Sequence, residues 1–462
     1  MSSPVDRRLL DHPRGLWVLA GTEFWDRVSF HGMQALLVLY MVDTLLLPGH
    51  IEKVVGFDGF RAVIEAITGP LSTQALAAQT FGLYVGLVYF APIIGGAVGD
   101  RITGRRVAVI SGALLMTAGH FALAFDATFL VALLVLILGV GLLRGNLSAQ
   151  VKSLYEDGDR READAFQLYY VAINVGAFIA PIATGALAAI YGWHTGFAFA
   201  GTGMLAGLVA YLVGQKHLPA DPASTAELRV KLSRAERRRI AGLALVWPVS
   251  VTFWIAQTQV WNIYNLWARD HLDLVVGGYS MPVPWLQAID GVAPVIMLPP
   301  ILALWRWQSI RNREPDSLAK LAIGCAVFSA GTLLLAAAPM ASGPDGKAPL
   351  FWAVAFHFVS NLGWLFFTPI IMTLFATRAP ASLRGTMIGV NATAVFAGSV
   401  ISGRIGGLYE RVSAADFWLL HAAVCAGGCL LILLMAPAIR QLLGDDKKPE
   451  TATSLPRRRP NT

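Results

Sequence analysis

Residues 95–106 read GGAVGDRITGRR and stand between two long apolar runs. Glycine lets the backbone turn tightly because it has no Cβ to clash. The turn presents Asp100 beside Arg101 and Arg105, charges that can exchange ion-pair partners when packed helices shift. We therefore predict a charged turn between two helices that takes part in conformational gating. The alternative is an ordinary basic turn without such a role.

The composition indicates that the solvent of this chain is lipid. Of the 462 residues, 55% are hydrophobic and 14% are charged, and the mean hydropathy is +0.58. A water-soluble domain needs more polar surface than this, whereas a spanning helix needs about 20 mostly apolar residues. The fold class we predict is an all-α membrane protein with roughly twelve spanning helices of that length. The apolar runs begin near Leu16, Gln79, Val107, Phe129, Leu168, Gly196, Gly242, Pro284, Leu318, Phe351, Met387 and Phe417.

The distribution of charge sets the expected orientation. The chain carries 36 Lys and Arg against 29 Asp and Glu, a net charge of +7. Most of the basic residues fall in the termini and in every second loop. Five fall in the other loops, namely Lys53, Arg61, Arg269, Lys347 and Arg411. Basic residues collect in cytoplasmic loops, so we expect both termini in the cytoplasm. A nucleic-acid partner is not expected, because it would require one basic face with aromatic side chains.

A polar linker divides the apolar runs into two groups of six. We expect an N-terminal six-helix bundle at 1–214, a cytoplasmic linker at 215–239, a C-terminal six-helix bundle at 240–443 and a disordered cytoplasmic tail at 444–462. This arrangement is typical of transporters that hold their substrate at the membrane midplane between two halves. The linker is too short to contain further spanning helices.

Cofactors, metals and catalysis are not expected. The three cysteines, Cys325, Cys425 and Cys429, lie in apolar runs without further metal ligands nearby. No nucleophile–base arrangement and no phosphate-binding Gly-Lys motif appears. An enzyme or an ATP-driven pump is therefore disfavoured.

The first apolar run contains three charges, in the stretch TEFWDRVSFHGM at 22–33. Glu23 and Arg27 are four residues apart on a helix, and Asp26 lies on the same broad face. Charges inside a membrane are expensive, so they should face a watery cavity and pair with one another. A carboxylate beside an arginine can exchange its proton as such a cavity opens and closes. A static salt bridge that only orients the helix is the alternative.

Two of these stretches resemble known families. Residues 95–106 resemble the cytoplasmic signature of the major facilitator superfamily, G-x-x-x-D-R-x-G-R-R/K, with one additional residue. Residues 12–40 resemble the opening of the proton-dependent oligopeptide transporters, whose motif is E-x-x-E-R-F-x-Y-Y-G. Glu23 and Arg27 match the proton-coupling acid and arginine of that motif, and Asp26 replaces its second glutamate. In place of the paired tyrosines, which contact peptide in the family, this chain has Phe30 and His31.

The fourth and fifth helices extend the resemblance. The stretch GVGLLRGNLS at 139–148 is similar to G-x-G-x-x-K-P-N-x-S, and AFQLYYVAINVGA at 165–177 is similar to A-F-x-x-F-Y-x-x-I-N-x-G-A. The resemblance implies that Arg144 binds the peptide carboxylate and that Asn174 contacts the peptide backbone or amine. Arginine can hold a carboxylate with two parallel hydrogen bonds, so its exchange for the family's lysine is chemically tolerable.

The second half departs further from the family pattern. Residues 253–268 resemble the seventh-helix pattern, with Gln259 at an amide position, and Asp290 stands where the eighth-helix motif has asparagine. In the tenth helix, His357 takes the place of a usual tyrosine and Trp364 that of the glutamate that reads the peptide amine. The resemblance implies that all four line the substrate cavity.

Asp290 is the candidate replacement for the missing glutamate. Removing one partner of a buried ion pair costs about 3–5 kcal/mol, so we hypothesise that Asp290 pairs with Arg144 or takes the substrate amine. The alternative is an acid near the helix end that meets water. Trp364 either stacks on a flat substrate group or only fills space. His120, His357 and His421 are expected to pack by hydrogen bonds, and His357 is the best candidate among them for a proton relay.

One outer loop, at 48–79, is unusually long. Its segment 60–67 reads FRAVIEAI, which favours a short amphipathic helix that serves as a structural cap or as a lid over the substrate entrance. The sequence gives no account of Arg404 in the eleventh helix.

The resemblance implies a monomeric proton symporter in a bacterial inner membrane that imports di- or tripeptides, or peptide-like compounds, by alternating access. Its partners would be the peptide substrate, protons and the lipid bilayer. The first alternative keeps the fold and changes the cargo to a modified amino acid, an anion or a drug-like molecule, with export as an option. The second is a non-transporting membrane sensor or an enzyme.

Overall fold

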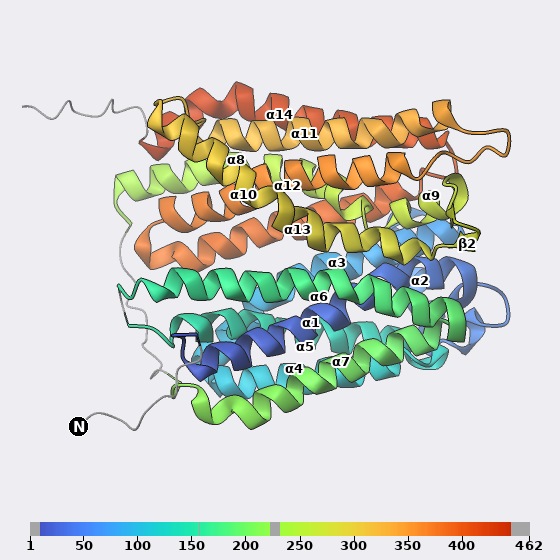
Figure 1. Cartoon of the computed structure of the whole chain (residues 1–462), viewed down its shortest axis with the longest axis horizontal. Coiled ribbons are helices and arrows are strands. Elements are labelled where there is room, and N and C mark those ends of the chain that lie inside the picture. The colour runs from blue at the N-terminus through green and yellow to red at the C-terminus, as the bar shows by residue number, and fades with distance from the viewer. Residues whose placement is uncertain (1–9, 157, 222–231, 445–462) are drawn as a thin grey trace, which may run out of the picture.

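The computed structural model describes residues 10–156, 158–221 and 232–444. Apart from Gly444, the expected disordered tail at 444–462 lies outside the described residues. Within these ranges the chain forms two helical bundles that lie side by side, one blue to green and one yellow-green to red in Figure 1.

The first bundle contains six long helices and one short one. The long helices are α1 (Arg14–Tyr40), α3 (Thr73–Val98), α4 (Arg105–Ala122), α5 (Phe129–Lys152), α6 (Arg161–Tyr191) and α7 (Trp193–Gly214), and the short one is α2 (Phe57–Thr68). Two π-helical segments extend α1 and α3, at Met41–Leu45 and Gly99–Thr103. Short 3-10 segments occur at Ile51–Lys53, Asp126–Thr128 and Gln215–His217.

The second bundle follows the linker. Its helices are α8 (Arg234–Gln259), continued after a break by α9 (Ile263–His271), then α10 (Ile289–Ile310), α11 (Ser317–Ala337), α12 (Phe351–Arg378), α13 (Arg384–Gly406) and α14 (Ala414–Leu443). Strands β1 (Val275–Val276) and β2 (Tyr279–Ser280) pair antiparallel in a small hairpin. Short 3-10 segments occur at Val283–Ala288, Ala338–Ala341 and Ala381–Leu383.

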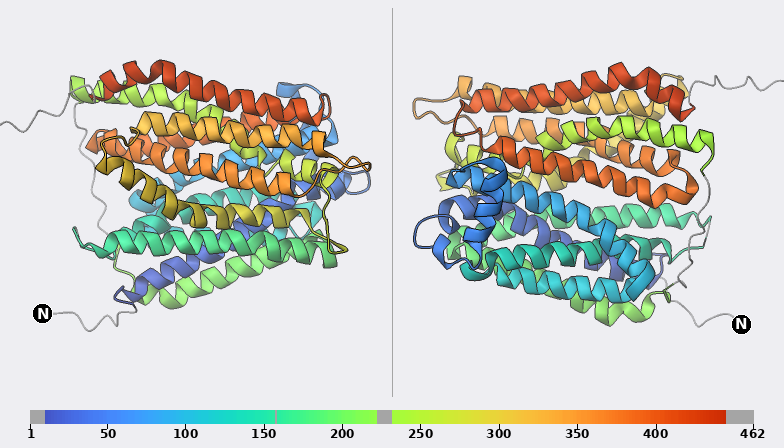
Figure 2. Two further views of the ribbon diagram at one scale, coloured as in Figure 1. Left: turned by 45° about the horizontal axis from the view of Figure 1, so that its top comes forward. Right: turned by 180° about the vertical axis from the view of Figure 1, so that it is seen from behind.

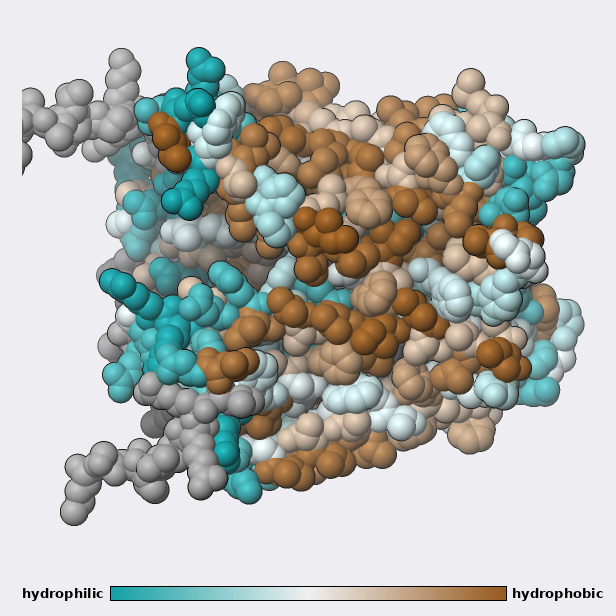
Figure 3. Space-filling view, viewed as in Figure 1, coloured by the Kyte–Doolittle hydropathy of each residue, from teal (hydrophilic) through white to brown (hydrophobic). Residues whose placement is uncertain are grey.

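The predicted all-α membrane fold is confirmed. In the part of the chain that the structure describes, eleven helical segments are long and apolar enough to cross a membrane. Helix α4 lies beside them against α5 and α7, but its Arg105, Arg106 and His120 make it less apolar. On the face drawn in Figure 3, a broad apolar band crosses the molecule, and polar residues gather toward its two ends. A band of this kind is what the hydrocarbon core of a bilayer requires.

Helices α3 and α13 bring the two bundles into close contact. A Cβ at Gly82 would lie 2.4 Å from the carbonyl oxygen of Ser399, so a larger residue does not fit at this crossing. Gly403 of α13 approaches α3 in the same way, because its Cβ position is 2.8 Å from the carbonyl oxygen of Ala78. Small residues are what membrane helices use where their backbones approach closely.

Polar contacts join the bundles at the end of the molecule that carries α2 and the hairpin, on the right in Figure 1. Arg269 of α9 forms an ion pair with Asp43, just beyond α1. Nη2 of Arg404 in α13 donates a hydrogen bond to the carbonyl oxygen of Thr68 at 2.7 Å. Arg404, whose role the sequence left unexplained, therefore caps the last turn of α2 and connects the two halves.

The long loop at 48–79 contains the predicted short helix at 60–67, since α2 spans it. Within α2, Nε of Arg61 and Oε1 of Glu65 are 2.9 Å apart. The same carboxyl accepts a hydrogen bond from the backbone N–H of Leu71, at 3.0 Å. The Leu71 N–H and then the Arg61 side chain lower the pKa of Glu65. The helix is thus fixed to the chain that leads into α3.

The charged turn at 95–106 continues α3 before it reverses. Gly104 has a φ of +80°, a left-handed conformation that a residue with a Cβ adopts only with strain. Asp100 Oδ1 lies 2.7 Å from Nε of Arg105, so the ion pair in this structure is local to the turn.

The turn also holds the start of the linker through hydrogen bonds of Arg106. Figure 2 shows the molecule in two further views, including from behind. Nη2 of Arg106 donates to the carbonyl oxygens of Leu218 and Pro219, at 3.0 and 2.9 Å. The backbone N–H of Arg106 donates to Oδ2 of Asp221, at 3.2 Å. Helix α7 is therefore followed by a segment that docks on the α3–α4 turn.

Candidate functional site

A buried polar network connects α1, α5 and α6. In α1, Arg27 donates from Nε to Oε1 of Glu23 at 2.7 Å, and its Nη2 lies 2.5 Å from the same oxygen. Asp26 Oδ2 lies 3.0 Å from Nε of Arg144 in α5 and 3.4 Å from Nε of Arg27. The hydroxyl of Tyr169 in α6 donates to Oε2 of Glu23, at 2.5 Å. Three helices thus contribute five side chains to one continuous network.

The position of α1 explains why these charges meet. Helix α1 is enclosed by its neighbours over most of its length, and Glu23 and Asp26 are only 2% and 0% exposed. Helix α6 approaches α1 closely, since a Cβ at Gly176 would lie 2.7 Å from the carbonyl oxygen of Phe24. Two turns before Gly176, this contact brings Tyr169 within reach of Glu23. The expectation that the three charges of α1 pair inside the protein agrees with this geometry.

The network is balanced in charge. Two carboxylates face two guanidinium groups, and Asp26 is shared between both arginines. An uncompensated charge at this depth is strongly unfavourable. Two polar atoms of the network, Oδ1 of Asp26 and Nη2 of Arg144, are buried without a hydrogen-bond partner among the described residues. Oδ1 of Asp26 can accept a hydrogen bond, and Nη2 of Arg144 can donate one to a ligand, without breaking the existing pairs.

Aromatic rings border the network toward the second bundle. The guanidinium carbon of Arg144 lies 4.1 Å from the centre of the Phe30 ring, in a cation–π contact. The ring of His31 packs on Trp261, with ring centres 5.1 Å apart, and its Nδ1 has no partner among the described residues. The two residues that replace the family's tyrosines therefore lie beside Arg144 and at the contact between the bundles.

A second polar cluster lies in the second bundle, where α9, α10 and α12 meet. Oδ1 of Asp290 lies 2.7 Å from Nδ1 of His357 and accepts a hydrogen bond from Nδ2 of Asn361, also at 2.7 Å. Nε2 of His357 lies 2.9 Å from the hydroxyl oxygen of Tyr264. His357 is 0% exposed. The cluster therefore places a carboxylate, an imidazole and a phenol in one hydrogen-bonded chain.

The hypothesis that Asp290 pairs with Arg144 is wrong for this structure. Arg144 is paired with Asp26, the residue at the second acidic position of the α1 motif. Asp290 is paired with His357 instead, because α10 and α12 pack together within the same bundle. The alternative, an acid that only meets water, also fails, since the Asp290 side chain is 13% exposed.

Three other residues predicted to line the substrate cavity make contacts within the protein. Nδ2 of Asn174 donates to the carbonyl oxygen of Tyr170, and Nε2 of Gln259 donates to that of Ser402, both at 2.8 Å. Trp364 packs with the apolar residues between α10, α11 and α12. Contact with substrate stays a prediction for these three residues. In the charged turn, Asp100 and Arg105 are brought together, whereas Arg101 is exposed.

Sequence reasoning missed several residues of the two clusters. Tyr169 and Tyr264 lie within the quoted motifs, but only the fold shows that their hydroxyl groups reach Glu23 and His357. Asn361 stands at the threonine position of the tenth-helix motif, four residues after His357. This spacing indicates that the two side chains share one face of the helix. The ion pair of Asp43 with Arg269 joins residues too far apart in sequence to be paired by pattern.

The remaining buried histidines and the cysteines form no site. His421 hydrogen-bonds the carbonyl oxygen of Phe417, as expected for a packing histidine. Both ring nitrogens of His120 lack a partner among the described residues, so its expected hydrogen bonds are not found. Within the described ranges, no group of three or more His, Cys, Asp or Glu is arranged to hold a metal ion.

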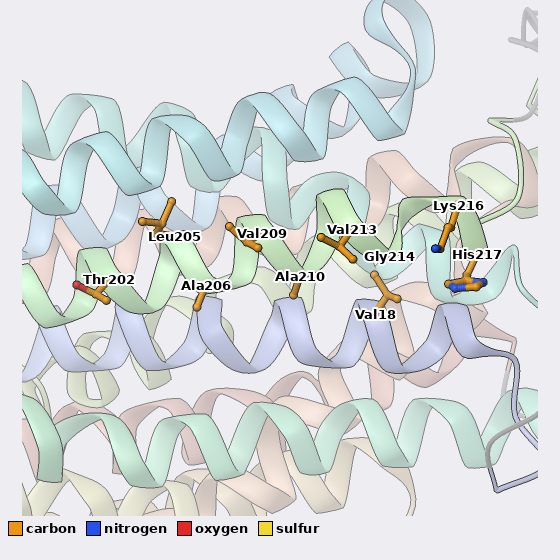
Figure 4. Close-up of a pocket in the computed structure, with 10 residues that line it drawn as sticks. All are labelled: Val18, Thr202, Leu205, Ala206, Val209, Ala210, Val213, Gly214, Lys216 and His217. Atoms are coloured by element: carbon orange, nitrogen blue, oxygen red, sulfur yellow. The ribbon is translucent and has the colours of Figure 1, made fainter.

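A shallow groove of about 760 Å³ lies elsewhere, along the outer side of α7 beside α1 (Figure 4). Its wall is mostly apolar and includes the exposed Val209 and Val213, with Lys216 and His217 at one end. The groove lacks the buried charges of the two clusters and is not the candidate site.

Known proteins resemble this chain along its whole length. A model of the POT family matches residues 106–229 and 223–419. The peptide transporter YePEPT of Yersinia enterocolitica is 28% identical over 98% of this chain and 99% of its own, and a di-/tripeptide transporter of Lactococcus lactis is 24% identical over 96% and 98%. A crystal structure of a peptide transporter POT in complex with sulfate superposes with a TM-score of 0.82, at 26% identity, covering 95% of this chain and 97% of the other.

Proposed function

Because this chain belongs to the POT family, we propose that it is a proton-coupled symporter that imports di- and tripeptides by alternating access. Its relatives in Yersinia and Lactococcus are named as peptide and di-/tripeptide transporters. A solved relative with a TM-score of 0.79 and 26% identity binds alafosfalin, a peptide-like compound. The proposal assigns transport rather than catalysis.

The network of Glu23, Asp26, Arg27 and Arg144 is the observation that carries the proposal. A carboxylate held by a guanidinium and a tyrosine hydroxyl is stabilised in its charged form. If the helices rearrange so that Arg27 leaves Glu23, that carboxyl is left buried without a cation and takes up a proton. Proton binding at Glu23 is thereby tied to the arrangement of α1, α5 and α6.

The peptide termini would meet opposite charges. Nη2 of Arg144 is unpartnered within the described residues and can donate to a substrate carboxylate. Oδ2 of Asp290, also buried and unpartnered there, can accept from a substrate amine. Phe30 and His31 border Arg144 and would contact the substrate between its termini.

Orientation and gating follow from the charges and from the contacts between bundles. We propose both termini in the cytoplasm of a bacterial cell, so that the end with α2, Arg269 and Asp43 faces outward. The ion pair of Arg269 with Asp43 then closes the outer end, and the charged turn with Asp100, Arg101 and Arg105 acts at the inner end. We also propose that the protein works as a monomer, because residues of one chain form both polar clusters.

The test is uptake of labelled dialanine into proteoliposomes with and without an inward proton gradient. The parent should accumulate dialanine only with the gradient, and Glu23→Gln should lose the accumulation while still exchanging internal for external dialanine. Glu65→Gln, which changes a carboxyl of α2 outside the membrane, is the matched control and should accumulate like the parent. Absence of dialanine uptake by folded parent protein would refute the proposal, and competition with amine-blocked and carboxyl-blocked dipeptides then tests for another cargo.

A further inference from the structure

The cluster in the second bundle has a different charge from the network around Glu23. Asp290 contributes a carboxylate, and its contacts are an imidazole and an amide rather than a guanidinium. The two arginines of the membrane interior described above, Arg27 and Arg144, are already engaged with Glu23 and Asp26. The cluster therefore carries a negative charge whenever His357 is neutral.

Hydrogen bonding defines where an additional proton can bind. With Asp290 ionised and a proton on Nδ1 of His357, Nε2 of the imidazole accepts a hydrogen bond from the Tyr264 hydroxyl. A further proton on Nε2 turns the cluster into a neutral pair of imidazolium and carboxylate, and the Tyr264 oxygen becomes the acceptor. In both states Asp290, His357 and Tyr264 keep the hydrogen bonds that join them. The cluster can therefore gain or lose a proton without a large rearrangement.

Burial makes the proton occupancy sensitive to the surroundings. An isolated carboxylate in a low-dielectric interior is costly, whereas a hydrogen-bonded pair of opposite charges costs less. The titratable groups that contact His357 are Asp290 from α10 and Tyr264 from α9, and Asn361 of α12 is the uncharged partner of the carboxyl. Water or a cationic group that reaches Oδ2 of Asp290 would favour release of the additional proton.

The cluster lies at a contact between the bundles. Next to Asp290, the backbone of α10 touches that of α6, because a Cβ at Gly291 would lie 2.4 Å from the backbone nitrogen of Phe178. Nearby, Nε1 of Trp285 donates to the carbonyl oxygen of Ile182 at 3.1 Å. When one bundle rocks against the other, α10 must shift along α6, and the surroundings of Asp290 change with it.

Helix α9 provides a second mechanical link. It carries Tyr264 and, one and a half turns later, Arg269, which pairs with Asp43 of the first bundle. Opening of that ion pair would remove one contact that holds α9, and a shift of α9 would change the distance between Tyr264 and His357. The three members of the cluster thus belong to three helices, two of which also contact the other bundle.

From this geometry we propose that Asp290, His357 and Tyr264 form a second proton-carrying site, separate from Glu23, that binds one proton on one side of the membrane and releases it on the other in each cycle. The inference rests on the proposed symport function and extends it to the proton stoichiometry. The proton enters from water at the outer end and leaves to water at the inner end, so no other reactant is needed.

The test compares the number of protons carried per peptide. In proteoliposomes with fixed dialanine and pH gradients, the membrane potential at which dialanine flux reverses gives this ratio, which does not depend on how fast a variant works. We expect His357→Gln and Asp290→Asn each to carry one proton fewer per dialanine than the parent. His421→Gln, which changes another buried histidine of the same bundle, should keep the parental ratio.

The outcomes separate the two proposals. An unchanged ratio in His357→Gln and in Asp290→Asn overturns the second site, even though dialanine symport by the parent stands. A parent without gradient-driven uptake overturns symport itself. A variant that folds but transports too slowly is examined by calorimetry of dialanine binding in buffers with different ionisation enthalpies. That measurement should then show fewer protons exchanged on binding than in the parent, and an equal number contradicts the inference.

Discussion

The two polar clusters differ in how their charge is compensated. Around Glu23 and Asp26, two permanent cations hold two carboxylates, and the network is neutral as long as its geometry is intact. Among the described residues that contact Asp290, His357 is the one that can become a cation. The charge balance of the first cluster therefore depends on the positions of the helices. The charge balance of the second cluster also depends on whether His357 carries an additional proton. In the cycle proposed above, the first cluster responds to conformation and the second also responds to protonation.

The largest effect is expected from removing a permanent cation of the first cluster. Arg27→Leu leaves Glu23 and Asp26 with Arg144 as their only guanidinium, and breaking a buried pair from one side costs about 3–5 kcal/mol. The purified variant should unfold at a clearly lower temperature than the parent in the same detergent. The double variant with Glu23→Leu should recover much of that loss, because no unpaired carboxylate remains. Equal melting temperatures for Arg27→Leu and the parent would mean that the network contributes little to folding.

A smaller effect is expected on substrate affinity, and it should distinguish the clusters. Arg144→Gln removes the proposed partner of the peptide carboxylate, a charge-assisted contact whose loss should raise the KM for dialanine about 10- to 100-fold. Asp290→Asn should raise it less, about threefold to 10-fold, because asparagine can still accept a hydrogen bond from the substrate amine. Competition by amine-blocked and carboxyl-blocked dipeptides measures which end each variant no longer recognises. If Arg144→Gln leaves the KM unchanged, the carboxylate binds elsewhere.

The smallest effect is expected at the ion pair of Arg269 with Asp43, which belongs to neither cluster and is proposed to close the outer end. Arg269 and Asp43 are partly exposed, and exposed pairs contribute about 0–1 kcal/mol. Asp43→Asn should change the KM for dialanine less than about fivefold, in line with that energy, and raising the salt concentration should reduce the difference from the parent. A loss of transport as complete as that expected for Glu23→Gln would show that the pair is an essential gate.

Much of the fold could be predicted from the sequence because lipid imposes a simple pattern. Apolar runs of spanning length have few other structures available, and the POT resemblance drawn from the motifs is confirmed by the family match. Helix boundaries were less predictable. Helix α3 begins at Thr73 rather than near Gln79, because Ser72 caps it and the polar Thr73 and Gln74 extend it beyond the apolar run. A hydropathy pattern does not detect polar residues that extend the end of a helix.

The composition of the site could be predicted, but only part of its pairing. Glu23 and Arg27 pair as expected because their spacing on one helix fixes their distance. Partners on different helices depend on the register of those helices, which no local pattern contains. For that reason the sequence allowed an ion pair of Arg144 with Asp290. The packing of α5 against α1 brings Arg144 to Asp26 instead. The cap that Arg404 forms on α2 escaped prediction for the same reason.

The docking of Leu218 and Pro219 on Arg106 has a practical consequence for protein engineering. The segment after α7 is bound to the α3–α4 turn as far as Asp221. A protein domain inserted before Asp221 would therefore disturb the turn directly. A fluorescent reporter intended to follow the movement of the bundles in living cells belongs beyond Asp221. There the graft leaves the anchor intact, and its signal reports on the separation of the halves rather than on damage at the anchor.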